Sequence, residues 1–161
     1  MGNYRPDNLD VVWCAFPYAQ NATFKPGDKA RPCLVIGREL NIVRPDDEFV
    51  YVAYGTSQIS KPAKYRVLVD DPLSMKDAGL WHPTLFRIDQ VALLPFNKEF
   101  FPLIPAPASL DHKPKTSCRM GVFNERCRRS LIATFKDMKN DGIDLDDFLF
   151  AAKKQTHKMR L

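Results

Sequence analysis

One arginine and two hydroxyl side chains stand at the ends of apolar segments, where they could bind a phosphate. Arg31 precedes Pro32 at the start of one segment, and Thr56 and Ser57 follow Gly55 at the end of another. A guanidinium stays charged and offers five donors in a planar fork, which suits a phosphate whose charge grows in a transition state. Glycine lets the backbone approach a ligand closely. On chemistry alone, a surface arginine in a salt bridge and ordinary turn residues are the commoner explanation.

Short apolar segments rich in β-branched and aromatic residues must position these side chains. They predict strands over residues 11–16, 32–36, 49–54, 65–69 and 91–94. Turn sequences rich in Pro, Gly and Asp separate them, at residues 25–28, 44–47 and 70–72. A short helix is expected over residues 73–78, ended by Gly79. Five or so short strands with such loops predict a small, strongly bent barrel.

The composition changes from Phe100 onward. Four prolines between residues 102 and 114 exclude a helix or a central strand there, so this span is expected to be a connector. Apolar residues then recur every three or four positions and predict one buried stripe on a helix over residues 121–139; they are Phe123, Cys127, Leu131, Phe135 and Met138. The sequence therefore predicts a barrel domain over residues 1–98 and a proline-rich connector with a helical extension over residues 99–161.

A second helix is expected after Gly142, which is a plausible helix stop. Asp144 would be its N-cap, and the carboxylates of Asp146 and Asp147 would lie in its first turn. This helix should bury Phe148 and one of two alanines, Ala151 or Ala152.

The net charge of the 161 residues is +5, which fits a partner rich in phosphate. Several of the 24 Lys and Arg residues fall in the C-terminal third, where a solvated helix face explains them equally well. Lys25 and Lys29 are the basic residues that could gather near Arg31.

Several other kinds of site are not expected. The four cysteines contain no CxxC pair, which favours reduced thiols in a cytoplasmic protein, and no Cys and His set has zinc spacing, so no metal is expected. No apolar run approaches the roughly 20 residues that span a bilayer, and the N-terminus lacks the apolar core of a signal peptide. His82 has no second histidine near it in sequence, so a structural or solvated role is expected for it.

The order of three segments resembles the PemK/MazF family of toxin endoribonucleases. A strand carries Trp13, the pair Arg31-Pro32 opens a second strand, and Thr56-Ser57-Gln58 closes a third. A later segment, residues 86–91 with the sequence FRIDQV, resembles the Asp-Gln-Val sequence at the start of a later strand in the family. The resemblance therefore covers roughly residues 9–96. It implies a mainly β fold, an SH3-like barrel of five to seven strands of the PemK/MazF/CcdB type with C-terminal helices.

The resemblance also implies a site and a chemistry. Arg31 and Thr56 match the residues assigned to catalysis in the family, where the 2′-hydroxyl of single-stranded RNA attacks the adjacent phosphorus without a metal or another cofactor. The products carry 2′,3′-cyclic phosphate and 5′-hydroxyl ends. RNA-binding residues would be Phe16, Lys25, Lys29, Ser57 and Gln58. Bases could stack on Phe16, although a role as a core aromatic remains an alternative for this ring. For Trp13 the core role is favoured.

The resemblance further implies a cytoplasmic homodimer that acts on messenger RNA and is blocked by a cognate antitoxin. Two departures stand out: the loop of residues 20–29 offers only Asp28 where many members carry an acidic residue, and the tail beyond Asn97 is long. One alternative is a non-catalytic homologue on the same barrel that binds a protein target, such as gyrase. Another makes the C-terminal helices a docking surface, with the stripe of residues 123–138 exposed.

Overall fold

The computed structural model describes residues 4–17, 25–40 and 48–160. Within them the chain forms one antiparallel sheet, three α-helices and one turn of 3-10 helix. The strands are β1 (Asp10–Cys14), β2 (Arg31–Leu40), β3 (Glu48–Thr56), β4 (Arg66–Val69), β5 (Thr84–Pro95) and β6 (Arg119–Val122). The helices are α1 (Pro72–Asp77), η1 (Ala106–Ala108), α2 (Glu125–Asn140) and α3 (Leu145–Arg160). The turn expected at residues 44–47 lies outside the described residues.

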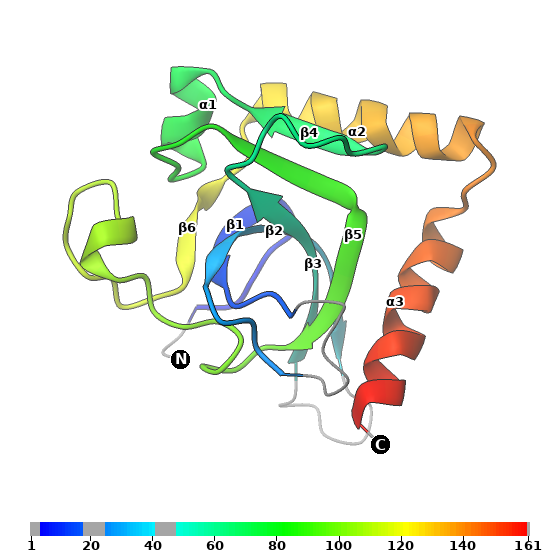
Figure 1. The fold of residues 1–161 in the computed structure, drawn as a ribbon, viewed down its shortest axis with the longest axis horizontal. Helices are drawn as coiled ribbons and strands as arrows, with labels where there is room; N and C mark the ends of the chain where they lie inside the picture. Colours follow the sequence, from blue (N-terminus) through cyan, green and yellow to red (C-terminus); the bar gives the residue numbers. More distant parts are fainter. Residues whose placement is uncertain (1–3, 18–24, 41–47, 161) are drawn as a thin grey trace.

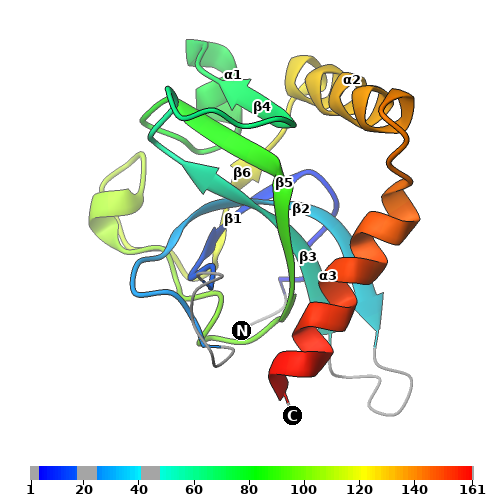
Figure 2. The same ribbon diagram turned by 45° about the vertical axis from the view of Figure 1, so that its right-hand side comes forward.

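The six strands pair in the order β4-β5-β3-β2-β1-β6, and every pair is antiparallel. Figures 1 and 2 show the sheet curling into a half-barrel, with α2 lying over β4 and α3 running alongside β5. The register shifts between Val35 and Gly37 and between Ala53 and Tyr54, and such irregularities bend strands. The predicted mainly β, barrel-like fold with C-terminal helices is confirmed.

The sequence missed β6. Its residues pair with β1 through Asp10↔Val122 and Val11↔Gly121, in a region expected to belong to the connector and to the start of a helix. The helix begins later because Asn124 caps it: the Oδ1 atom of Asn124 accepts a hydrogen bond from the backbone nitrogen of Cys127 at 3.0 Å. The sheet therefore takes its sixth strand from beyond the boundary expected at residue 98.

The apolar stripe of α2 is buried. Phe123, Cys127, Leu131 and Met138 are each under 5% exposed and belong to a core cluster with residues from β1, β2, β3 and β5, against which Phe135 also packs. The hypothesis that this stripe is an exposed docking surface is therefore wrong, because its side chains are already covered by the sheet.

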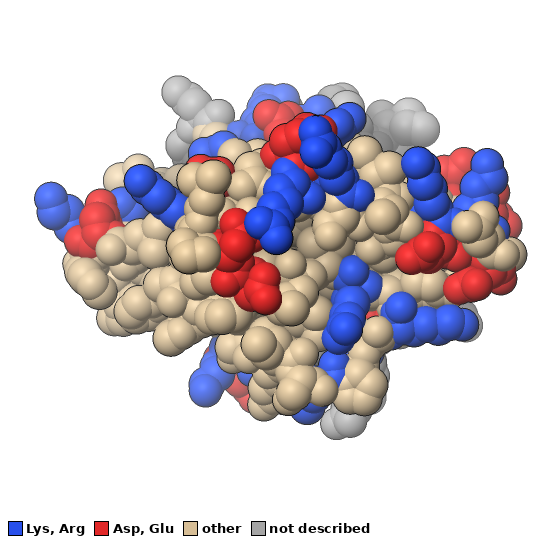
Figure 3. Space-filling view, turned by 90° about the horizontal axis from the view of Figure 1, so that it is seen from above, with Lys and Arg blue, Asp and Glu red and all other residues tan. Residues whose placement is uncertain are grey.

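The outer face of α2 is polar and mixed in charge. Arg128 and Arg129 lie 3.5 and 3.4 Å from Glu125, and Arg126 lies 3.8 Å from Asp71. Figure 3 shows Lys and Arg interspersed with Asp and Glu over the face seen from above. This arrangement fits a solvated helix face rather than a basic patch for a polyanion.

The predicted helix boundaries around α1, α2 and α3 are largely confirmed. Gly79 and Gly142 follow α1 and α2 with φ angles of +72° and +83°, which glycine adopts without strain. The Oδ1 atom of Asp144 accepts from the backbone nitrogen of Asp147 at 3.1 Å, as expected of an N-cap. Phe148 packs against the core, whereas Ala151 is exposed and Ala152 is half-buried.

A tyrosine ties the C-terminal helices to the barrel. The hydroxyl of Tyr65 donates to Oδ2 of Asp141, in the turn after α2, at 2.6 Å, and this hydrogen bond raises the pKa of Tyr65 to about 12. Tyrosine in an unfolded chain titrates near pH 10, so above about pH 10 the unfolded state loses this proton first. The contribution of Tyr65 to stability is therefore present below about pH 10 and is lost as the pH rises toward 12.

We expect Tyr65→Phe to lower the melting temperature at neutral pH. It should also make the fall of melting temperature between about pH 10 and 12 shallower, because the variant has no proton to lose at this position. Thermal unfolding followed by circular dichroism across this range checks both effects. Equal slopes for the two proteins would show that Tyr65 does not link pH to stability.

Candidate functional site

The ends of β2 and β3 bring Arg31 and Thr56 together. Cys33 pairs with Tyr54, and Gly55 lies directly against the backbone of Pro32, so the same register sets Arg31 opposite Thr56. Residues two apart on a strand share a face, which puts both side chains on the face that carries Tyr54. The guanidinium carbon of Arg31 lies 5.7 Å from the centre of the Tyr54 ring.

The Arg31 side chain has no salt bridge or hydrogen bond to another described residue. Its Nε atom is buried and has no hydrogen-bond partner among them. A buried donor without a partner costs free energy, and such groups are rare in folded proteins. The expectation of a surface arginine in a salt bridge does not fit this placement.

The Thr56 hydroxyl lies just inside the surface. Its side chain is 6% exposed, and its Oγ1 atom accepts from the backbone nitrogen of Gln58 at 3.1 Å. Because this bond uses a lone pair of the oxygen, the hydroxyl proton remains to be donated to a bound group.

Phe16 lies in the core. It is 5% exposed, and its ring packs edge-on against Tyr54 with the ring centres 5.2 Å apart. The expectation that bases stack on Phe16 is not supported by this placement, because neither face of the ring is open in the described structure. Phe16 instead supports Tyr54, which in turn lies under Arg31.

The other residues expected to bind RNA lie at the surface at this end of the sheet. Ser57 and Gln58 are exposed just after β3, and Lys25 and Lys29 are exposed before β2. The loop holding these lysines is tied to the end of β1 by a hydrogen bond from the backbone nitrogen of Gly27 to the carbonyl of Ala15, at 3.0 Å. Asp28, the acidic candidate in this loop, is also exposed; residues 18–24 lie outside the described residues.

A second arginine on the same face was missed as a site residue. Arg87 pairs directly with Tyr54 across β3 and β5, so the two side chains share a face. Its Nη2 and Nε atoms donate to the carboxylate of Asp89 at 3.0 and 3.2 Å, and this interaction raises the pKa of Arg87. The signal in the sequence was the alternation of Arg87 and Asp89 around the buried Ile88, which marks a half-buried polar face.

A pocket of about 170 Å³ opens at the same end of the sheet. It reaches Arg31 and Ser57, and on the other side it is walled by residues of β1, β6 and the turn before β5. The lining residues are Trp13, Ala30, Arg31, Pro32, Gly55, Ser57, Leu80, Trp81, His82, Thr84 and Met120. Trp13 packs against the core, as expected, but it also forms part of this wall. His82 lies in the wall too, which its isolation in the sequence could not indicate.

Other kinds of site find no support in the part of the chain that is described. There, no group of three or more His, Cys, Asp and Glu residues could hold a metal ion. The four cysteines are buried and unbridged, and burial raises the pKa of Cys14 and Cys118. None of the described helices has the length and apolar character needed to cross a membrane.

Comparison with known families gives one match. Residues 7–101, more than half of the chain, match the model of a family described as PemK-like, MazF-like toxin of type II toxin-antitoxin system. The matched part begins before β1 and ends after β5, so it contains both Arg31 and Thr56 but not β6, α2 or α3. No curated protein matches the chain.

Proposed function

Because the chain belongs to the PemK-like, MazF-like toxins of type II toxin-antitoxin systems, we propose that it is an endoribonuclease that cuts single-stranded RNA without a metal ion. One observation carries the proposal: the register of β2 and β3 sets Arg31 opposite Thr56, and the buried Nε atom of Arg31 has no hydrogen-bond partner among the described residues. An anionic phosphate is the ligand that such a donor set recognises best.

The proposed reaction is an attack within the RNA itself. The 2′-oxygen gives its proton to water and bonds to the adjacent phosphorus, and the bond from phosphorus to the 5′-oxygen breaks as that oxygen takes a proton from water or from Arg31. The fragments then end in a 2′,3′-cyclic phosphate and a 5′-hydroxyl. Arg31 binds the non-bridging oxygens as negative charge grows on them, takes part in proton transfer, and is assisted by a hydrogen bond donated by Thr56.

Arg87 adds a second cation on the same face. Asp89 holds its guanidinium through two hydrogen bonds, which fixes the orientation of the planar group. In the proposal, Arg87 helps to bind the phosphate that Arg31 contacts, because both side chains flank Tyr54.

Single-stranded RNA is the proposed substrate for two reasons. Only RNA carries the attacking 2′-hydroxyl, and unpaired bases can be splayed and contacted at their edges. The exposed Lys25, Lys29, Ser57 and Gln58 surround the strand ends and would contact the backbone of a messenger RNA on either side of the cut.

Membership of the family implies an antitoxin partner. We further propose a cytoplasmic homodimer whose RNA groove lies near the subunit interface, with the antitoxin covering that groove. Binding of the antitoxin would then inhibit the enzyme by keeping phosphate away from Arg31.

The proposal predicts that the purified protein cuts a long unstructured RNA in excess chelator and leaves single-stranded DNA of the same sequence intact. DNA should still bind, because the phosphate contacts do not require the 2′-hydroxyl. Gel electrophoresis of both nucleic acids, with binding measured by fluorescence anisotropy, checks the prediction. Cleavage of DNA, or RNA that stays intact over a broad range of sequences, would contradict it.

A further inference from the structure

Trp81 is an exposed aromatic side chain in the wall of the pocket that reaches Arg31. It is 46% exposed, and it comes from the turn between α1 and β5. Large aromatic side chains are usually buried, and an exposed one beside polar groups often marks a binding surface. Among the described residues, none covers the exposed part of this indole.

Two histidines hold the indole in place. The ring centre of His82 lies 5.1 Å from that of Trp81 at an interplanar angle of 39°, and His112 approaches it edge-on at 5.9 Å. His112 follows Pro107 and Ser109 in a segment beyond the matched residues 7–101. Trp81 is therefore oriented partly by a segment that lies outside the matched residues.

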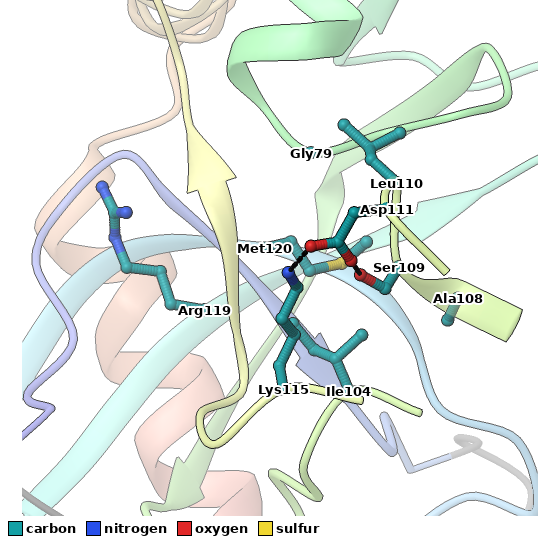
Figure 4. Close-up of a pocket in the computed structure, with 9 residues that line it drawn as sticks. All are labelled: Gly79, Ile104, Ala108, Ser109, Leu110, Asp111, Lys115, Arg119 and Met120. Carbon is teal, nitrogen blue, oxygen red and sulfur yellow. Dashed lines mark hydrogen bonds and ion pairs between the residues drawn. The ribbon is translucent and has the colours of Figure 1, made fainter. Parts of the chain in front are cut away.

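The segment that carries His112 is braced by a carboxylate. Figure 4 shows Asp111 between Ser109 and Lys115, whose side chains donate to it at 2.7 and 2.6 Å. The backbone nitrogen of Lys113 donates to the same group at 3.1 Å. These bonds hold the segment in one conformation, in which His112 adopts a φ angle of +57°.

A second pocket, of about 200 Å³, lies on the other side of Met120 and is lined by Asp111, Lys115 and Leu110 among others. Met120 lines both pockets. The two pockets are therefore neighbours, one reaching Arg31 and Trp81 and the other reaching the braced segment.

We propose that Trp81 is a stacking platform for one base of the RNA, next to the phosphate bound at Arg31. The inference rests on the RNA substrate of the proposed function, but not on cleavage. The pocket is smaller than the roughly 300–1,000 Å³ of a site for a drug-sized ligand, so it accepts one ring system rather than a whole nucleotide. Stacking on an aromatic face tolerates every base, because every base has a π-face.

The rest of the pocket suits a base better than an apolar side chain of a protein. Ser57 and His82 place a hydroxyl and an imidazole at the exposed rim, where the polar edge of a base can form hydrogen bonds. Trp13 adds a second indole to the wall. The pocket also extends to Arg31, so a base on Trp81 and a phosphate on Arg31 can belong to one strand.

The test measures binding separately from cleavage. Wild type, Trp81→Ala, Trp81→Phe and the control Leu73→Ala are titrated into a fluorescent short 2′-O-methyl RNA of random sequence, which cannot be cut. Leu73 is 67% exposed on α1 and lines neither pocket, so its variant controls for loss of an exposed apolar side chain. A matched strand without bases is titrated in parallel, and melting temperatures establish that each variant is folded.

We expect Trp81→Ala to raise the dissociation constant for the RNA by roughly 5- to 150-fold, with Trp81→Phe recovering part of the loss and Leu73→Ala unchanged. Removing the bases should weaken binding more for wild type than for Trp81→Ala, because the variant has already lost the stacking partner. Trp81-dependent binding of this RNA, combined with no cleavage of unmodified RNA in the chelator assay described above, would support the platform and refute the proposed nuclease. Equal affinities for wild type and Trp81→Ala, or no RNA binding by wild type, would overturn the platform, and the first result would indicate that the ring serves a protein partner.

Discussion

Replacing Arg31 with alanine is expected to slow RNA cleavage by roughly 10²- to 10³-fold, the cost of removing one preorganised donor to a developing oxyanion. The fold should survive, because the Nε atom of Arg31 has no hydrogen-bond partner among the described residues and its removal leaves no other group unpaired. Arg31→Lys should recover little activity, since an ammonium cannot reproduce the planar fork. Initial rates on a fluorescent RNA, with melting temperatures for each variant, measure both effects.

Arg38→Ala is the matched control. Arg38 lies on the same strand, β2, but pairs at the surface with Asp7 and Glu48 at 3.8 and 3.7 Å. Its loss should leave the cleavage rate within a small factor of wild type. The fold should also survive, because exposed ion pairs contribute little to stability. Equal rates for wild type and Arg31→Ala would show that the phosphate is bound elsewhere.

The second large effect concerns stability. Gly55→Ala would put a Cβ atom 2.0 Å from the carbonyl oxygen of Pro32 and 3.0 Å from its carbonyl carbon. These are backbone atoms of the neighbouring strand, so β2 and β3 must move apart at the position where they hold Arg31 and Thr56. We expect a loss on the order of 3 kcal/mol in the free energy of unfolding, a large part of the 5–15 kcal/mol typical of a domain.

Gly37→Ala tests whether a glycine-to-alanine change elsewhere in this pair of strands causes the same loss of stability. There the nearest atom to the added Cβ would be Cδ2 of Tyr51 at 3.1 Å, the edge of a side-chain ring that can shift. Urea unfolding should give a much smaller loss for Gly37→Ala than for Gly55→Ala. Similar losses would contradict the view that contact with the Pro32 backbone is what requires glycine at position 55.

The sequence predicted the parts of the fold that local patterns encode. The buried runs of β1, β2 and β3, the stripe of α2, and the helix stops at Gly79 and Gly142 are all in place. These features depend on residues within one element and its turns, which is the information that periodicity carries.

The pairing of strands that are distant in the sequence could not be predicted from the sequence. The four residues of β6 form a strand only because β1 offers an unpaired edge more than a hundred residues earlier. The first part of β5, residues 84–90, was missed because Arg87 and Asp89, which bond to each other in the fold, interrupt the apolar pattern. Both strands form because of contacts with residues that are distant in the sequence, and strand formation depends strongly on such context.

The candidate site, too, could be predicted only in part from the sequence. Arg31 and Thr56 were chosen through a family resemblance, and the register of β2 and β3 then brings them to one face. Arg87, Trp81 and His112 reach this end of the sheet from other segments, so their proximity could only emerge from the fold. The unpaired Nε atom of Arg31 is likewise a property of packing rather than of sequence.

The most direct test of the central claim is the chemistry of the cut ends. Wild type and Arg31→Ala are incubated with one long unstructured RNA in excess chelator, and the fragment ends are identified by enzymatic labelling and mass spectrometry. The account predicts discrete cuts with 2′,3′-cyclic phosphate and 5′-hydroxyl ends for wild type, and intact RNA for the variant over the same time. Ends with a 5′-phosphate, or the same cuts made by Arg31→Ala, would contradict it.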